Sequence, residues 1–308
     1  NIIFNNTELD DLIILRSDGT QTYHLCNVVD DYEQGVTTVI RGEDHISNTP
    51  RQIHIQNALG YPELEYAHLP LVLGADKKRL SKRHAATSLE EYKQDGYLDS
   101  AILNTLARLG WSKGEKEVFY LEDLIEDFEI TEVQKAGAIF DVSKLDYLNA
   151  QHMANLSHKE FINYLNPFLI ELGIDICEHE KTDLLIESMR TSENTLKGVA
   201  SNLVCYFKNV DTYNEKAIEK FITSDQLLID LKDKINDLES WDESSLDNLL
   251  LQYREEHGLS VPKVNQPIRI ALTGSTNSPS LGLTLYLFDK KEVLKRLDQL
   301  IEHLHTKN

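Results

Sequence analysis

The first seventy positions alternate between short apolar runs and segments of helical periodicity. Residues 36–40 form a β-branched run that is typical of a strand buried on both faces, and residues 68–73 predict a second short strand. Helices are predicted at 23–32 and, between the two strands, from Pro50 to Gly60. A strand, a helix and a strand at this spacing predict a parallel, doubly wound sheet, whose ligands bind at the carboxyl ends of the strands.

The pattern becomes helical from about residue 88 onward. Apolar positions between 101 and 109 lie on one helical face, and Gly110 closes that helix. Short loops are predicted at 265–267 and 274–279. Beyond about residue 150 nearly every segment has helical periodicity, including 159–172, 194–207, 225–238, 243–257 and 290–305. The C-terminal half is therefore predicted to be a helical bundle or a pair of bundles.

Composition and charge narrow the class of protein. The 308 residues are enough for two or three domains, and no apolar stretch approaches the roughly 20 residues that a membrane helix needs. A formal net charge of -20 argues against a general nucleic-acid binder, because polyanions are bound by local excesses of Lys and Arg. The chain also begins at Asn1, without an initiator Met, inside a predicted strand. We therefore expect residues to be missing upstream.

One segment reverses the acidic balance of the chain. Lys77, Lys78, Arg79, Lys82 and Arg83 put five cations into seven positions. Such a cluster beside the rim of a sheet suits a polyphosphate, because cations neutralise the charge that develops on a leaving pyrophosphate. A solvated surface loop is the alternative, and composition by itself leaves both open.

Three residues could hold a small anionic ligand. Tyr23 and Asn27 are four apart, so they share one face of the predicted helix and could bind a ligand together. Arg41 stands at the end of an apolar strand, where a guanidinium needs either a bound anion or a paired acid. Its planar fork of donors suits a carboxylate. Pairing with Glu43 or Asp44 is the alternative reading.

The cysteines and histidines predict no metal site. Cys26, Cys177 and Cys205 are widely separated and lack zinc-ligand spacing, and the histidines show no regular spacing either. No Gly-x-x-x-x-Gly-Lys phosphate loop, nucleophile elbow or Gly-x-Gly-x-x-Gly fingerprint is present. The candidate residues for chemistry are therefore the basic segment at 77–83 and the three residues Tyr23, Asn27 and Arg41.

Read in order, many short segments resemble the second half of the active-site domain of bacterial glutamyl-tRNA synthetases. Residues 39–45 read Val-Ile-Arg-Gly-Glu-Asp-His, and residues 80–84 read Leu-Ser-Lys-Arg-His. The matching segments are 17–25, 28–31, 39–45, 48–52, 67–71, 80–84 and 107–112. Further matches at 140–145 and 267–281 extend the resemblance over essentially the whole chain.

The resemblance implies an α/β fold followed by helices. Residues 1–87 are expected to form the C-terminal part of a Rossmann-type class I catalytic domain. Residues 88–150 would be a mostly α-helical stem-contact region, and residues 151–308 an α-helical bundle that binds the anticodon, with a subdivision near residue 238.

The resemblance also implies a reaction, that of a glutamate–tRNA ligase. ATP with Mg²⁺ would activate L-glutamate to glutamyl-adenylate, and the acyl group would then pass to the 3' end of tRNA(Glu). Lys82, assisted by Ser81, is expected to contact the ATP phosphates and stabilise the leaving pyrophosphate. Arg79 departs from the usual Lys of the family but keeps the charge. The ATP-binding residues implied are Arg79, Leu80, Ser81, Lys82, Arg83, Asp44 and His45.

For the amino acid, the resemblance places the glutamate side-chain carboxylate on Arg41, with Tyr23 and Asn27 lining the same pocket. Glutamine would be rejected because its neutral amide would leave the Arg41 charge unpaired. The resemblance implies that tRNA is bound by a local cationic track and by contacts from the helical half to single-stranded bases. Such binding does not need a net positive charge on the whole chain, so the acidic composition is compatible with it. The positions expected at the anticodon are Arg190, Arg269 and Leu281.

The His-x-Gly-His signature that class I synthetases carry near the start of this domain is absent from the sequence. We therefore expect the chain to be a C-terminal fragment that cannot form adenylate alone. Three alternatives remain: a glutaminyl-tRNA synthetase, which carries β-barrels after the active-site domain; a glutamyl-queuosine synthetase, which lacks an anticodon domain; and a non-catalytic tRNA-binding module. The protein is expected to be a cytoplasmic monomer without a resident metal.

Overall fold

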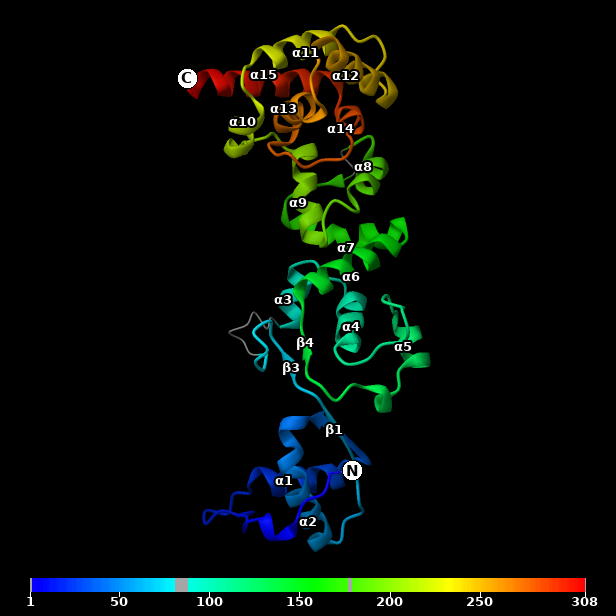
Figure 1. The fold of residues 1–308 in the computed structure, drawn as a ribbon, viewed down its shortest axis with the longest axis vertical. Coiled ribbons are helices and arrows are strands. Elements are labelled where there is room, and N and C mark those ends of the chain that lie inside the picture. Colours follow the sequence, from blue (N-terminus) through cyan, green and yellow to red (C-terminus); the bar gives the residue numbers. More distant parts are fainter. Residues whose placement is uncertain (1, 81–87, 177–178, 308) are drawn as a thin grey trace. The chain divides into compact units, whose positions relative to one another are not determined.

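The computed structural model describes residues 2–80, 88–176 and 179–307. They form two compact units, one made of residues 1–87 and 103–145 and the other of residues 88–102 and 146–308 (Figure 1). None of the described helices combines the length and low polarity that crossing a bilayer requires. Each unit is described by itself below.

The first unit contains the strand–helix–strand arrangement predicted from the sequence. Its elements are α1 (Tyr23–Glu33), β1 (Thr38–Gly42), α2 (Thr49–Leu59) and β2 (Glu65–Leu69). The two strands are parallel, with Arg41 opposite His68 in the register. Gly60 ends α2 in the left-handed conformation, at a φ of 71° that suits a residue without a Cβ.

Two details of the predicted sheet are wrong. The second strand is β2 at 65–69 rather than 68–73, because Pro70 has no N–H to continue the ladder. The next two residues, β3 (Val72–Leu73), pair instead with β4 (Ala138–Ile139) in a separate two-stranded parallel ladder. The predicted burial of both faces also fails, since Ile40 of β1 is 54% exposed. A β-branched run predicts extended backbone, whereas burial depends on what packs over each face.

The remainder of the first unit has a small aromatic core. Trp111, Phe119 and Leu124 are buried together, and the Trp111 and Phe119 ring centroids lie 5.1 Å apart. Leu124 belongs to α5 (Leu121–Asp127), whereas α4 (Asp99–Arg108) and α6 (Val142–Asn155) each have residues in both units. The helix predicted from the apolar face at 101–109 is thus confirmed as α4.

The second unit is helical, as predicted, around one continuous apolar core. The predicted helices at 159–172, 194–207, 225–238, 243–257 and 290–305 are confirmed to within a few residues. The helices besides α4 and α6 are α3 (Leu89–Gln94), α7 (His158–Glu171), α8 (Thr182–Met189), α9 (Leu196–Phe207), α10 (Glu215–Phe221), α11 (Gln226–Asn236), α12 (Glu243–His257), α13 (Val261–Thr273), α14 (Leu281–Leu287) and α15 (Lys290–Lys307).

The predicted loop at 265–267 is wrong, because these residues lie inside α13. An internal proline costs a helix about 3 kcal/mol through its missing N–H and its ring. Val264, Ile268 and Leu272 of the same helix are fully buried, and each buried side chain of this size contributes about 1.5–3 kcal/mol. Packing therefore outweighs the proline at position 267. The loop predicted at 274–279 does separate α13 from α14.

A buried arginine joins three helices of this unit. Arg296 of α15 is only 3% exposed, and its guanidinium donates to the carbonyl oxygens of Cys205, Lys208 and Leu272. These carbonyls lie at the C-terminal ends of α9 and α13, where helices leave acceptors without partners and carry partial negative charge. Nε of Arg296 also donates to Glu292 at 2.7 Å. One cation thus satisfies the ends of two helices.

Arg296→Met should lower the free energy of unfolding by about 3–5 kcal/mol, because it leaves three carbonyl oxygens at two helix ends without their buried donor. Lys295→Met is the matched control. Lys295 contacts the same Glu292 from an exposed position, so its loss should cost at most about 1 kcal/mol. Urea unfolding followed by circular dichroism measures both, and equal losses would contradict the role given to Arg296.

Candidate functional site

Arg41 lies next to the carboxyl end of β1 and is held there by neutral groups. Its guanidinium donates to Thr49 Oγ1 at 2.8 Å and to His68 Nε2 at 3.4 Å. Among the described residues, no carboxylate lies within ion-pair distance of Arg41. Glu43 instead accepts a hydrogen bond from the Leu71 N–H, and Asp44 pairs with Arg79. The alternative prediction, an ion pair of Arg41 with Glu43 or Asp44, is therefore wrong.

Thr49 organises the surroundings of Arg41. Its hydroxyl oxygen lies 3.0 Å from His68 Nε2 and 3.3 Å from the carbonyl oxygen of His45. Burial, with the nearby Arg41 and His45 as smaller contributions, lowers the pKa of His68 below its ordinary value. The imidazole is therefore neutral at neutral pH, and the positive charge at the strand end belongs to Arg41 alone among these three side chains.

One face of α1 is turned toward Arg41. His24 and Asp31 lie on either side of Asn27 at helical spacing. Burial lowers the pKa of His24, and the charges of Arg51 and Arg41 lower it further. Burial raises the pKa of the Asp31 carboxyl, and Arg41 opposes that rise. The Arg41 charge thus influences the pKa of two residues on the Asn27 face. Asn27 itself contacts α2, the helix whose Thr49 contacts Arg41.

Tyr23 and Asn27 occupy different positions on this face. Tyr23 is the first residue of α1 and is about half exposed, with its ring centroid 6.4 Å from that of His45. Asn27 is half-buried, and its Oδ1 accepts a hydrogen bond from Gln52 Nε2 at 2.7 Å. Sequence reasoning missed Gln52, because a glutamine within a helix gives no signal until its burial is known.

The start of the basic segment forms a hairpin. The Gly74 N–H donates to the carbonyl of Lys78, and the Leu80 N–H donates to that of Val72. Arg79 therefore lies across from β3, and its guanidinium reaches Asp44 at 3.1 Å. Two of the predicted ATP-binding residues, Arg79 and Asp44, are thus brought together.

The rest of the basic segment, Ser81, Lys82 and Arg83, lies outside the described residues, and so do the catalytic assignments made for Ser81 and Lys82. Within the described part of the chain, no group of three or more His, Cys, Asp or Glu side chains is placed to hold a metal ion.

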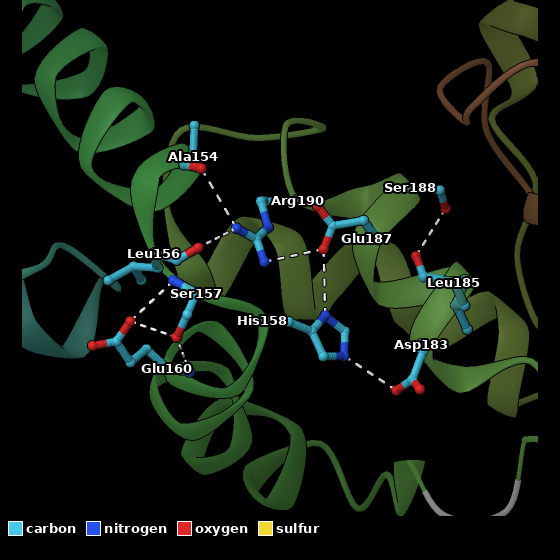
Figure 2. A network of polar contacts seen from close by, with 10 residues as sticks. All are labelled: Ala154, Leu156, Ser157, His158, Glu160, Asp183, Leu185, Glu187, Ser188 and Arg190. Atoms are coloured by element: carbon cyan, nitrogen blue, oxygen red, sulfur yellow. Dashed lines mark hydrogen bonds and ion pairs between the residues drawn. The ribbon is translucent and has the colours of Figure 1, made fainter.

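Arg190 lies in a buried polar network (Figure 2). It is 7% exposed, and its guanidinium donates to the carbonyl of Leu156 at 2.6 Å, beyond the C-terminal end of α6. It also pairs with Glu187, which lies 3.3 Å from His158 at the start of α7. These contacts connect the ends of α6, α7 and α8. A contact of Arg190 with the anticodon stays a prediction.

Arg269 and Leu281 lie on either side of the loop between α13 and α14. Arg269 donates to Ser278 Oγ at 2.9 Å and to the carbonyl of Pro279 at 2.8 Å, and burial lowers its pKa. Leu281 is the first residue of α14 and is only 3% exposed. Arg269 thus fixes the loop, and Leu281 belongs to the apolar core of the helical unit. Their predicted contact with the anticodon stays untested.

Two family descriptions match the chain. Residues 1–147 match the catalytic domain of the class I (E and Q) tRNA synthetases, and residues 160–301 match an anticodon binding domain. The first match includes the whole Arg41 site. The second includes most of the helical unit.

The chain is similar to proteins named glutamate–tRNA ligase. It is 42% identical over 98% of its length to the ligase of Thermodesulfovibrio yellowstonii and 43% identical over 97% to that of Geotalea uraniireducens, and it spans 66% and 65% of these relatives. A solved glutamate tRNA ligase from Elizabethkingia meningosepticum, in complex with its amino acid, superposes with a TM-score of 0.81 at 28% identity, over 97% of this chain and 63% of that one. The chain thus spans just under two thirds of the relatives it matches.

His68 gives the site a dependence on pH. Its pKa is lowered in the folded chain, so the unfolded chain binds the proton more tightly, and the His68 contribution should be lost as pH falls below about 6.5. The stability advantage of wild type over His68→Gln should therefore shrink between pH 7.5 and pH 5.5. Urea unfolding of both proteins at the two pH values measures the difference in their free energies of unfolding. The contributions of titrating groups that the two proteins share cancel in this difference. An advantage that is constant or grows in acid would contradict it.

Proposed function

Since residues 1–147 match the catalytic domain of the class I (E and Q) tRNA synthetases and residues 160–301 an anticodon binding domain, we propose that the protein is a glutamate–tRNA ligase. The observation that carries the proposal is Arg41, a cation held by two neutral partners, Thr49 and His68. An acceptor-only carboxylate is the ligand that such a set of donors satisfies best.

Arg41 would bind the side-chain carboxylate of L-glutamate. Thr49 and His68 fix its guanidinium without neutralising it, so the charge is available to the ligand. Asn27 and Tyr23 would supply further hydrogen bonds from α1. Positioning the amino acid in this way brings its α-carboxylate to a fixed place, where attack on the α-phosphate of ATP yields glutamyl-adenylate and pyrophosphate.

ATP, as its Mg²⁺ complex, would lie against the basic segment. Asp44 holds Arg79 in an exposed ion pair, which is worth at most about 1 kcal/mol and can exchange for a phosphate contact. We assign Lys82 to the leaving pyrophosphate, with Ser81, Leu80, Arg83 and the nearby His45 at the nucleotide. Arg79, in the described part of this segment, pairs with Asp44, three residues after Arg41, which suits a reaction joining the two substrates.

The helical second unit supports tRNA(Glu) as the acceptor of the activated glutamate. The proposed functional boundaries are residues 1–87 for the catalytic part, 88–150 for stem contact and 151–308 for anticodon contact, with Arg269 fixing the loop presented to the bases. A glutaminyl enzyme with β-barrels is disfavoured because the helices predicted after residue 150 are confirmed.

Arg41→Gln should lower kcat/KM for glutamate about 10- to 100-fold, because a hydrogen bond to a charged group is worth about 1.5–3 kcal/mol. Glutamate-dependent exchange of pyrophosphate into ATP, measured on the full-length protein, gives this value. Arg16→Gln is the control, since Arg16 forms hydrogen bonds only within the exposed turn at 16–21. Normal glutamate use by Arg41→Gln would remove Arg41 from the site.

Lys82→Ala should slow pyrophosphate exchange about 100-fold, because one electrostatic contact to developing charge contributes on that scale. Binding of tRNA, measured by filter retention, should change far less. Lys93→Ala, an exposed lysine of α3, controls for the loss of one positive charge. Unchanged exchange in the Lys82 variant would overturn its assignment.

A further inference from the structure

We propose that Gln52 is a positioning residue that sets the preference for glutamate over glutamine, by fixing which end of the Asn27 amide faces the ligand. The inference rests on the proposed function and extends it to a residue outside the ligand pocket. Its starting point is the hydrogen bond from Gln52 Nε2 to Asn27 Oδ1, which at 2.7 Å joins α2 to α1.

Gln52 is held rigidly. It is 1% exposed and follows Pro50, whose ring fixes the start of α2, and α2 packs directly against α1. Val28, the neighbour of Asn27 on α1, is 2% exposed. A buried amide on one packed helix thus contacts a half-buried amide on the other, with little freedom for either backbone to move.

The direction of the hydrogen bond is set by what surrounds Gln52. Its Oε1 is buried and has no hydrogen-bond partner among the described residues. Reversing the Gln52 amide would place an NH₂ group at that position, where it would have no acceptor. Buried N–H groups without a partner are rarer in proteins than carbonyl oxygens with spare capacity. The amide of Gln52 therefore keeps its donor toward Asn27.

The orientation of Asn27 follows from that of Gln52. With Oδ1 engaged by Gln52, the Nδ2 group is the end of the Asn27 amide left for a ligand. Thr49, one turn before Gln52 on α2, contacts Arg41. The same helix therefore joins Asn27 to the surroundings of Arg41. Of the groups assigned to the side-chain end of the ligand, the guanidinium of Arg41 and the NH₂ of Asn27 can only donate, whereas the Tyr23 hydroxyl can donate or accept.

Two groups that can only donate, Arg41 and the NH₂ of Asn27, distinguish a carboxylate from an amide. Both oxygens of the glutamate side chain accept hydrogen bonds, whereas the NH₂ of glutamine would face donors and lose its hydrogen bonds to water. An Asn27 free to rotate could turn Oδ1 toward that NH₂ and accept glutamine. Gln52 prevents this adaptation, and a site that rejects an analogue by leaving polar groups unpaired discriminates strongly.

The test compares two buried glutamines of the same helix. Gln52→Met removes the donor to Asn27, while Gln56→Met removes an equally buried amide one turn later, which accepts from the hydroxyl of Tyr66. Pyrophosphate exchange by the full-length protein, with glutamate and with glutamine, gives the ratio of the two kcat/KM values. We expect this ratio to fall about 10-fold in Gln52→Met and to stay within about 2-fold in Gln56→Met. Equal changes in the two variants would overturn the proposal.

Gln52→Glu provides a second variant of nearly identical shape. Its carboxylate can only accept, so Asn27 must turn its Nδ2 toward residue 52 and its Oδ1 toward the ligand. The glutamate preference should then fall further than in Gln52→Met. A preference like that of wild type in a folded Gln52→Glu protein would contradict the mechanism.

A double-mutant cycle separates positioning from general damage. In an Asn27→Ala background Gln52 has no amide to orient, so adding Gln52→Met should change the preference less than 2-fold. An undiminished 10-fold effect would show that Gln52 acts by another route. If wild type itself lacked glutamate-dependent exchange, the proposed ligase function would fail, whereas normal exchange with an unchanged preference in Gln52→Met would sink only the present inference.

Discussion

The proposed site in the first unit depends on one constraint. The Arg41 guanidinium is partly buried and has no carboxylate within ion-pair distance among the described residues. Arg41 is placed by the parallel pairing of β1 and β2, which sets it opposite His68, and by the start of α2, which supplies Thr49. Of the nearby acids, Glu43 accepts from the Leu71 N–H and Asp44 pairs with Arg79, while burial raises the pKa of Asp31 and the Arg41 charge opposes that rise. Lowering the pKa of His68 by burial keeps a second charge away. The fold thus preserves one cation for an anionic ligand.

The helical unit uses its buried cations differently. Arg296 and Arg190 both donate to carbonyl oxygens at or just beyond helix ends, the first at α9 and α13 and the second at α6. These are the positions where the helix dipole is negative and where acceptors lack intrahelical partners. Arg269 likewise satisfies the loop between α13 and α14. In an acidic chain, much of the buried positive charge therefore stabilises the helical scaffold that would present other residues to RNA.

The two units together give the proposed ligase a division of roles. In this proposal the strand-end site would recognise charge through a few directed donors, which neighbours such as Thr49 and Gln52 hold in place. The helical unit depends on a continuous apolar core and on satisfied helix ends. A mutation in either unit should therefore be interpreted first by which of these two kinds of support it removes.

Sequence alone determined the features that local chemistry encodes. Apolar periodicity predicted the helices now seen as α7, α9, α11, α12 and α15, and β-branched runs with Gly60 predicted the strand–helix–strand order. The ordered motifs indicated the class I synthetases, whose catalytic domain matches residues 1–147. Tertiary structure decided the rest, because it depends on which surfaces meet. Packing allows Pro267 to lie within α13 and buries Arg190. The tertiary structure also makes Thr49 and His68 the partners of Arg41. Sequence proximity had suggested Glu43 or Asp44 instead. The direction of the Gln52 amide belongs to the same class, since only its buried surroundings distinguish oxygen from nitrogen.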